Sequence, residues 1–135
     1  MTRREVRDSA FKIIYESLLR DDTVEELFAA AEGIDEVPVD DEVKSMVKDI
    51  IEKSSELDEM ISQHSKKRAL SRIAKINVAI LRIAFYEILY NDRIPTNAAI
   101  KEAVVLAQNY SFKEDVGFVN GVLGVYSRSQ NGEEK

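Results

Sequence analysis

The sequence predicts an all-α fold, and three observations support that prediction. Residues 76–90 form an apolar run that is interrupted only by Asn77, Arg82 and Glu87. The segments on either side of the run repeat apolar residues at helical spacing and begin with residues that cap helices. The chain of 135 residues contains only five Gly and two Pro, a composition that permits long helices. We therefore expect a helical bundle.

Residues 76–90 are expected to form the central helix of that bundle. Side chains turn by about 100° per residue in a helix, so the three polar residues point in different directions and leave no polar face. A helix that is apolar all round is buried. A bilayer span needs about 20 apolar residues, and this run is shorter and contains an Arg and a Glu. We expect no membrane association.

The first helix is predicted to begin at residue 3. Thr2 and Glu5 have the spacing of a capping box, in which each side chain accepts a hydrogen bond from the other residue's backbone N–H. Phe11, Ile14 and Leu18 then recur at helical spacing and form an apolar stripe. The stripe is expected to face the core.

The later helices are also predicted from their caps. Thr23 and Glu26 repeat the capping-box spacing, and Asp40 can cap a helix that we expect to continue to about residue 62. Ser71 can cap the central helix and Thr96 the next one. The last helix is expected to begin with a capping box of Ser111 and Glu114 and to bury Val116, Val119, Val122, Leu123 and Tyr126.

Composition excludes several classes of function. The chain has no Cys, so it has no disulfide framework and no thiolate metal site, which agrees with a reducing cytoplasm. His64 is the single histidine and has no ligand partners at metal-binding spacing. We found no catalytic triad, phosphate-binding loop, dinucleotide fingerprint or signal peptide. We expect a cytoplasmic protein that is not an enzyme and uses no cofactor.

The charges of the chain are segregated. The formal net charge of −6 argues against indiscriminate nucleic-acid binding. Residues 21–42 contain ten acids and no Lys or Arg, whereas residues 64–75 contain five Lys and Arg and no acid. Either run can be solvated surface, and the basic run can equally be part of a binding site.

Three arginines continue the core stripe of the first helix toward its N-terminus. Arg3, Arg4 and Arg7 can occupy that line only if the first turns extend beyond the body of the protein or if the side chains snorkel over its rim. Guanidinium groups bind phosphates bidentately and stack on bases, which points to an RNA site. The alternative is pairing within the chain with the acids of residues 21–42.

The last helix has two unusual features. Phe118 projects about 100° from the centre of the buried stripe, so it can stack on an unpaired base, worth about 1–3 kcal/mol, or pack at the boundary beside Val125. Gly117, Gly121 and Gly124 lie opposite the stripe. Exposed glycine in a helix is destabilising by about 0.5–1 kcal/mol relative to alanine, so close approach of another chain is a candidate reason.

Several motifs resemble the NusB family of bacterial transcription antitermination factors across nearly the whole chain. The C-terminal half contains AILRIAFYEILY, an Ile-Pro turn, AIKEAVVLAQ and FVNGVL in the order and spacing of the family. The N-terminal half contains RRxVRDSAFKIIY, which is similar to the family's arginine-rich motif. The resemblance implies two packed three-helix bundles with about six to seven helices. The subdomains would be residues 1–70 and 71–128, followed by a polar tail at 129–135.

The resemblance also implies a function. Family members bind the boxA element of ribosomal RNA leader transcripts together with NusE, a small-subunit ribosomal protein, within an RNA polymerase antitermination complex. On this basis the RNA-binding residues would be Arg3, Arg4, Arg7, Asp115 and Phe118. Tyr15 and Asn77 would contact NusE.

Two other functions stay open. The same fold resembles the N-terminal domain of certain RNA cytosine methyltransferases, but 135 residues leave no room for a catalytic domain. The chain could also form a homodimer that masks its own RNA site through the glycine face or the arginine turn.

Overall fold

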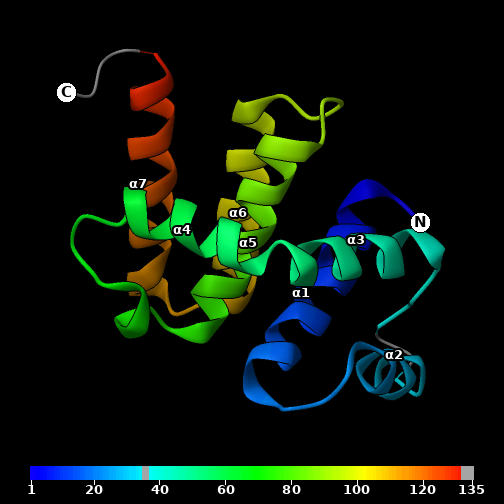
Figure 1. The fold of residues 1–135 in the computed structure, drawn as a ribbon. Helices are drawn as coiled ribbons and strands as arrows, with labels where there is room; N and C mark the ends of the chain where they lie inside the picture. Colours follow the sequence, from blue (N-terminus) through cyan, green and yellow to red (C-terminus); the bar gives the residue numbers. More distant parts are fainter. Residues whose placement is uncertain (35–36, 132–135) are drawn as a thin grey trace. The chain divides into compact units, whose positions relative to one another are not determined.

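The computed structural model describes residues 1–34 and 37–131 (Figure 1). The described residues form seven α-helices and one short 3-10 helix and contain no strand, which confirms the all-α prediction. No helix in this part of the chain is long and apolar enough to cross a membrane. The elements are α1 (Arg3–Leu19), α2 (Val24–Glu32), α3 (Asp41–Glu52), α4 (Ser54–His64), η1 (Leu70–Arg72), α5 (Lys75–Tyr90), α6 (Thr96–Tyr110) and α7 (Lys113–Gln130).

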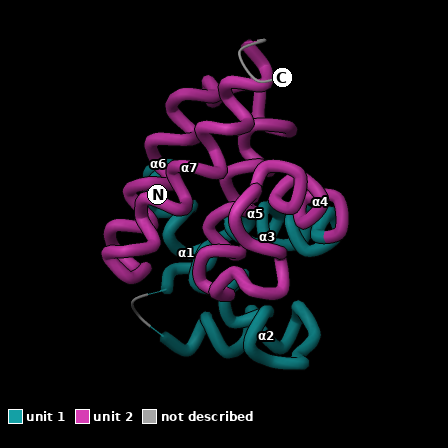
Figure 2. Tube along the Cα trace, turned by 90° about the vertical axis from the view of Figure 1, so that its left-hand side faces the viewer, with its two compact units in different colours: residues 1–54 teal, residues 55–135 magenta. Residues whose placement is uncertain are grey.

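The chain divides into two compact units (Figure 2), unit 1 comprising residues 1–54 and unit 2 comprising residues 55–135. Unit 1 ends at Ser54, and α4 contacts the central helix α5 of unit 2 through side chains such as Asp58 and Arg82. The expected subdomain boundary at about residue 70 stays a prediction. Of the expected polar tail, residues 132–135 lie outside the described residues.

Unit 1 is built on α1, which packs against α2 and α3. Phe11 and Ile14 of the expected stripe are buried, whereas Leu18 is half-buried at the C-terminal end of α1. The capping box of Thr23 and Glu26 is formed, with the Glu26 carboxylate accepting from the Thr23 backbone N–H at 2.8 Å. The capping boxes predicted at Thr2 and Thr23 and the Asp40 cap are confirmed.

The single helix predicted after Asp40 is wrong, because the structure forms two helices there. Helix α3 ends at Glu52, Lys53 leaves helical geometry, and α4 begins at Ser54. The apolar spacing runs unbroken through this junction, so the sequence pattern did not reveal it. The break separates a helix that packs on α1 in unit 1 from a helix that packs on α5 in unit 2.

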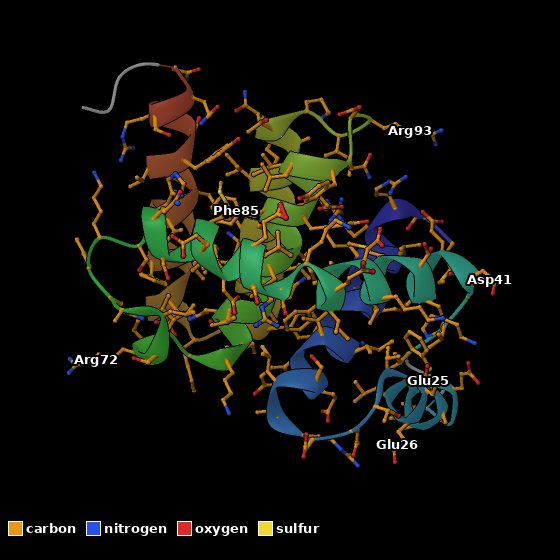
Figure 3. All side chains as sticks on the ribbon, in the orientation of Figure 1. Glu25, Glu26, Asp41, Arg72, Phe85 and Arg93 are labelled. Atoms are coloured by element: carbon orange, nitrogen blue, oxygen red, sulfur yellow. The ribbon has the colours of Figure 1, made fainter. Side chains whose placement is uncertain are left out.

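Unit 2 surrounds α5, whose predicted burial is confirmed. Helix α6 packs against both α5 and α7, and α4 also lies against α5. Phe85 of α5 is fully buried, and its ring centre lies 5.7 Å from that of His64 on α4 and 5.5 Å from that of Tyr126 on α7. Figure 3 shows Phe85 inside unit 2, while Glu25 and Asp41 project from unit 1.

Two polar side chains of α5 bond to neighbouring elements. Arg82 donates to both carboxylate oxygens of Asp58 on α4, at 2.8 and 2.7 Å. Asn77 accepts a hydrogen bond of 2.6 Å from the Ser111 hydroxyl, in the turn before α7. Ser111 is therefore not the cap that the sequence predicted, and α7 begins at Lys113 without a side-chain cap.

Two further predicted caps are also corrected. Ser71 lies within the short helix η1, and α5 begins at Lys75 without a side-chain cap. Thr96 is the first residue of α6, after Pro95, and its side chain makes no cap bond. Burial of the apolar faces stabilises these helices where capping does not.

Removal of the Asp58 carboxylate should destabilise unit 2. In the Asp58→Ala variant, the mostly buried Arg82 guanidinium loses two charge-assisted hydrogen bonds, worth about 1.5–3 kcal/mol. Urea denaturation should show this loss in the free energy of unfolding. The control is Glu59→Ala on the same helix, where an exposed side chain is lost and the change should stay within about 0.5 kcal/mol. Equal effects of the two variants would contradict the structural role of the pair.

The capping box of α2 should make stability depend on pH. The hydrogen bond from the Thr23 backbone N–H lowers the pKa of Glu26 below its ordinary value of 4.5. A carboxyl group with a lowered folded pKa stabilises the protein above the unfolded pKa, and this contribution is lost as the pH falls through the folded pKa. The Glu26→Gln variant should therefore be less stable than wild type at pH 7. The difference in the free energy of unfolding between the two proteins should shrink as the pH falls through the folded pKa of Glu26, and a difference that stays constant in denaturation curves at acidic pH would contradict this prediction.

Candidate nucleic-acid interface

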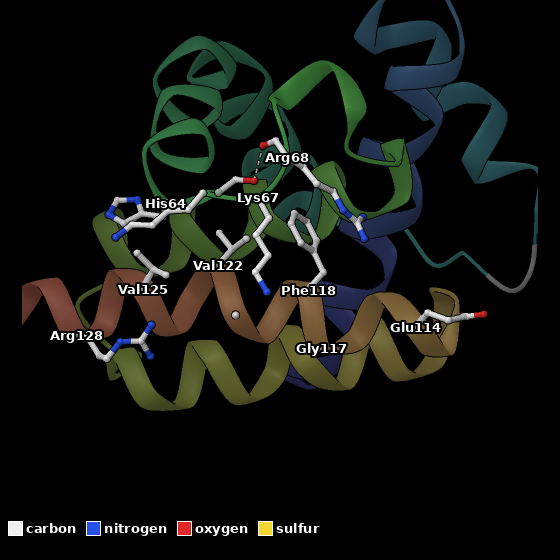
Figure 4. A pocket seen from close by; sticks show the side chains of 12 residues that line it. His64, Lys67, Arg68, Glu114, Gly117, Phe118, Val122, Val125 and Arg128 are labelled. Atoms are coloured by element: carbon white, nitrogen blue, oxygen red, sulfur yellow. Dashed lines mark hydrogen bonds between the residues drawn. The ribbon is translucent and has the colours of Figure 1, made fainter. Parts of the chain in front are cut away.

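A groove in unit 2 lies between residues 64–68 and helix α7 (Figure 4), and we call it the α7 groove. Its volume is about 520 Å³. Pockets that hold small organic ligands have volumes of about 300–1,000 Å³, so the groove has the size of a small-ligand site. The lining residues are His64, Ser65, Lys66, Lys67, Arg68, Glu114, Gly117, Phe118, Gly121, Val122, Val125 and Arg128.

Arg68 connects two of the residues that the sequence identified. Its guanidinium carbon lies 4.3 Å from the centre of the Phe118 ring, and its Nη1 lies 3.5 Å from Oδ1 of Asp115. Phe118 is half-buried, as predicted from its place off the core stripe. Cation–π contact and the ion pair together hold the aromatic ring at the rim of the groove.

The groove is basic although the chain as a whole is acidic. Lys66, Lys67, Arg68 and Arg128 are the Lys and Arg residues among its described lining residues, and Glu114 is the acid among them. Figure 4 shows Glu114 pointing away from the groove, whereas Lys67 reaches toward α7. The local charge therefore favours an anion.

Lys66, Lys67 and Arg68 come from a turn that is held by its own hydrogen bond. The Ser65 hydroxyl donates to the backbone oxygen of Arg68 at 2.6 Å, and Ser65 is buried. Sequence reasoning singled out the basic run without assigning Arg68 a role. The missing information was the contact with Phe118, which depends on residues far apart in the chain.

Two of the three glycines of α7 line the groove. No described atom of the surroundings lies within 4 Å of the position that a Cβ would take at Gly117 or Gly121. Gly124 differs, because Nη1 of Arg128 lies 3.3 Å from that position. The open glycine face is thus limited to Gly117 and Gly121.

The N-terminal arginines lie in unit 1 and are not alike. Arg3 and Arg4 are exposed. Nη1 of Arg3 lies 3.6 Å from Oε2 of Glu42, which is the pairing within the chain that the sequence left open. Both side chains are about half exposed. Exposed ion pairs contribute at most about 1 kcal/mol to stability. Arg7 is only 4% exposed, so the expectation that it presents its guanidinium to RNA is not supported. It lies in the buried part of α1, next to Val6.

The two expected contact residues for NusE also differ in exposure. Tyr15 is half-buried, and its ring stacks on that of Phe11 with the centres 6.1 Å apart. Asn77 is fully buried, and its Nδ2 has no hydrogen-bond partner among the described residues. This burial does not support a direct contact between the Asn77 side chain and a partner, and its Oδ1 accepts the hydrogen bond from Ser111.

Among the described residues, no group of three or more His, Asp or Glu side chains is placed to hold a metal ion. The groove presents basic side chains, the Phe118 ring and the open glycine face of Gly117 and Gly121. Such a surface can bind a polyanion that carries planar rings.

Comparisons with known proteins agree with one another. The model of the NusB family matches residues 4–128. The transcription antitermination protein NusB of Acetivibrio thermocellus is 41% identical over 126 residues, which cover 92% of this chain and 87% of that protein. The protein of the same name from Bacillus subtilis is 37% identical over 123 residues, 91% of this chain and 92% of that protein.

Solved structures give the same result. The structure of T. maritima NusB has a TM-score of 0.77 and 31% identity, covering 92% of this chain and 89% of that chain. A crystal structure of the antitermination factors NusB and NusE in complex with dsRNA has a TM-score of 0.79 and 25% identity, with coverage of 93% and 96%. With a family match over nearly its whole length, this chain belongs to the NusB family.

Proposed function

We propose that this chain is a transcription antitermination factor that binds boxA-type RNA together with NusE. The observation that carries the proposal is Phe118, a half-exposed aromatic ring held at the rim of a basic groove in an acidic chain. The relatives named as transcription antitermination proteins support the assignment, as does the solved complex of NusB, NusE and RNA. The chain acts by binding, without catalysis.

Phe118 and the basic side chains have separate tasks in this function. Cations attract phosphates without regard to sequence, and this attraction weakens as salt is raised. Unpaired bases stack on aromatic rings and expose their edges for recognition, which is how proteins select single-stranded RNA. Phe118 supplies the stacking surface, while Arg3 and Arg4 of unit 1 and Arg68 of unit 2 supply phosphate contacts.

Arg68 prepares the Phe118 ring for its ligand. It covers one face of the ring and is tied to Asp115, so the ring is held before RNA arrives. A base that approaches the other face would complete a sandwich of guanidinium, phenyl ring and base. Preorganisation of this kind reduces the entropy that is lost on binding.

NusE is the proposed protein partner, with Tyr15 as the contact. The tyrosine is half-exposed on α1 and supported by Phe11. The net charge of −6 repels RNA from much of the chain, so a partner of complementary charge should raise both the encounter rate and the specificity. We propose that the resulting assembly acts with RNA polymerase in the cytoplasm. A homodimer of this chain would compete with that assembly.

The Phe118→Ala variant should bind boxA-type RNA about 5- to 150-fold more weakly, because one stacked base contributes about 1–3 kcal/mol. Fluorescence anisotropy with boxA-type and scrambled RNA, with and without NusE, would measure this. Phe112→Ala is the matched control, because Phe112 is 73% exposed just before α7 and does not line the groove. If Phe118→Ala binds both RNAs as tightly as wild type, with and without NusE, stacking on Phe118 is disproved.

Arg4 and Arg7 should respond differently to substitution. Arg4→Gln should leave the melting temperature unchanged and reduce the slope of log affinity against log salt by about 0.7–1, as loss of one phosphate contact does. Arg7→Gln removes a buried charge and should instead lower the melting temperature. A lowered salt slope for Arg7→Gln with unchanged stability would show that Arg7 contacts RNA after all.

A further inference from the structure

We propose that the α7 groove beyond Phe118 binds the sugar–phosphate backbone of the nucleotides that adjoin the base stacked on Phe118. This inference rests on the proposed function and extends the RNA site along α7 as far as Arg128. Its ligand is a short single-stranded stretch of the same RNA.

Charge complementarity is the first argument. The basic side chains come from two separate segments, with Lys66, Lys67 and Arg68 on the turn after α4 and Arg128 near the end of α7. Lys67 and Arg68 lie across from α7, and Arg128 lies farther along that helix (Figure 4). Four cations around one groove, in a chain with ten acids in residues 21–42, favour a ligand with repeated negative charges.

The shape of the groove is the second argument. Gly117 and Gly121 are one helical turn apart, and the space where their side chains would lie is open. Glycine is where a ligand or a second backbone can approach a helix closely. A Cβ at either position would enter this open space without a described atom of the surroundings within 4 Å.

Continuity with the stacking site is the third argument. Phe118 lies between the two glycines in sequence and lines the same groove, together with Val122 and Val125. A nucleotide stacked on Phe118 would bring its neighbours to this surface, where the half-buried Val125 can contact a sugar and the cations can contact phosphates. An acidic peptide would also match the positive charge of the groove. It has no planar base to stack on the Phe118 ring, so RNA is the better match.

Gly121→Leu tests the inference without removing a charge or a protein contact. Leucine favours helix more than glycine does, so the variant should fold at least as stably, which thermal denaturation would verify. Asn120→Leu is the matched control, because Asn120 is the exposed neighbour on α7 and does not line the groove. Phe118→Ala is measured alongside to test the stacking site by itself.

The probe is a nested series of boxA-type RNAs shortened stepwise from each end, titrated by fluorescence anisotropy. Wild type and Asn120→Leu should lose affinity as nucleotides are removed from the end that occupies the groove. Gly121→Leu should bind the full-length RNA at least fivefold more weakly and should gain nothing from those terminal nucleotides. Lys67→Gln should reduce the salt slope for the longer RNAs only.

The outcomes separate this inference from the proposed function. If Gly121→Leu follows the wild type along the whole series while Phe118→Ala weakens every RNA, the groove inference is overturned and the proposed function stands. If Phe118→Ala binds every RNA like wild type, both are overturned. If Gly121→Leu changes only the mass seen by light scattering, or only the binding of an acidic peptide, the groove is a protein interface and the inference is overturned.

Discussion

Burial of α5 on all sides is the constraint on which unit 2 depends. Its residues have no polar face, and Phe85 lies fully buried between α4 and α7. A helix of this kind needs neighbours all round, which α4, α6 and α7 provide. Because α7 uses Val119 and Leu123 for the core, Gly117 and Phe118 are left on the side that lines the groove. The binding surface is therefore a consequence of how the core is filled.

The polar residues of α5 position both walls of that groove. Arg82 holds α4 through Asp58, and α4 leads directly into the basic turn with Arg68. Asn77 accepts from Ser111, in the turn that precedes α7. Hydrogen bonds between buried polar groups are directional, so they fix the orientation of neighbouring elements more narrowly than apolar contact does. The aromatic ring and the cations that flank it thus rest on contacts made in the interior.

The sequence predicted the features that are determined by residues close together in the chain. The helical class and the burial of α5 follow from apolar spacing. The caps at Thr2, Thr23 and Asp40 follow from side chains three residues from the N–H groups that they bind. The half-burial of Phe118 follows from its angle to the stripe of α7. Each of these is set within one or two helical turns, so the local pattern contains the information.

Tertiary structure decided where each local signal was used and where it was overridden. Ser111 had the spacing of a cap but bonds Asn77, 34 residues away. Arg7 continued an exposed arginine pattern but is buried, and the helix after Asp40 breaks at Lys53 although its apolar spacing continues. The contact of Arg68 with Asp115 joins residues 47 positions apart. Such pairings depend on how helices pack, and apolar spacing specifies which face is buried but not which distant side chain meets it.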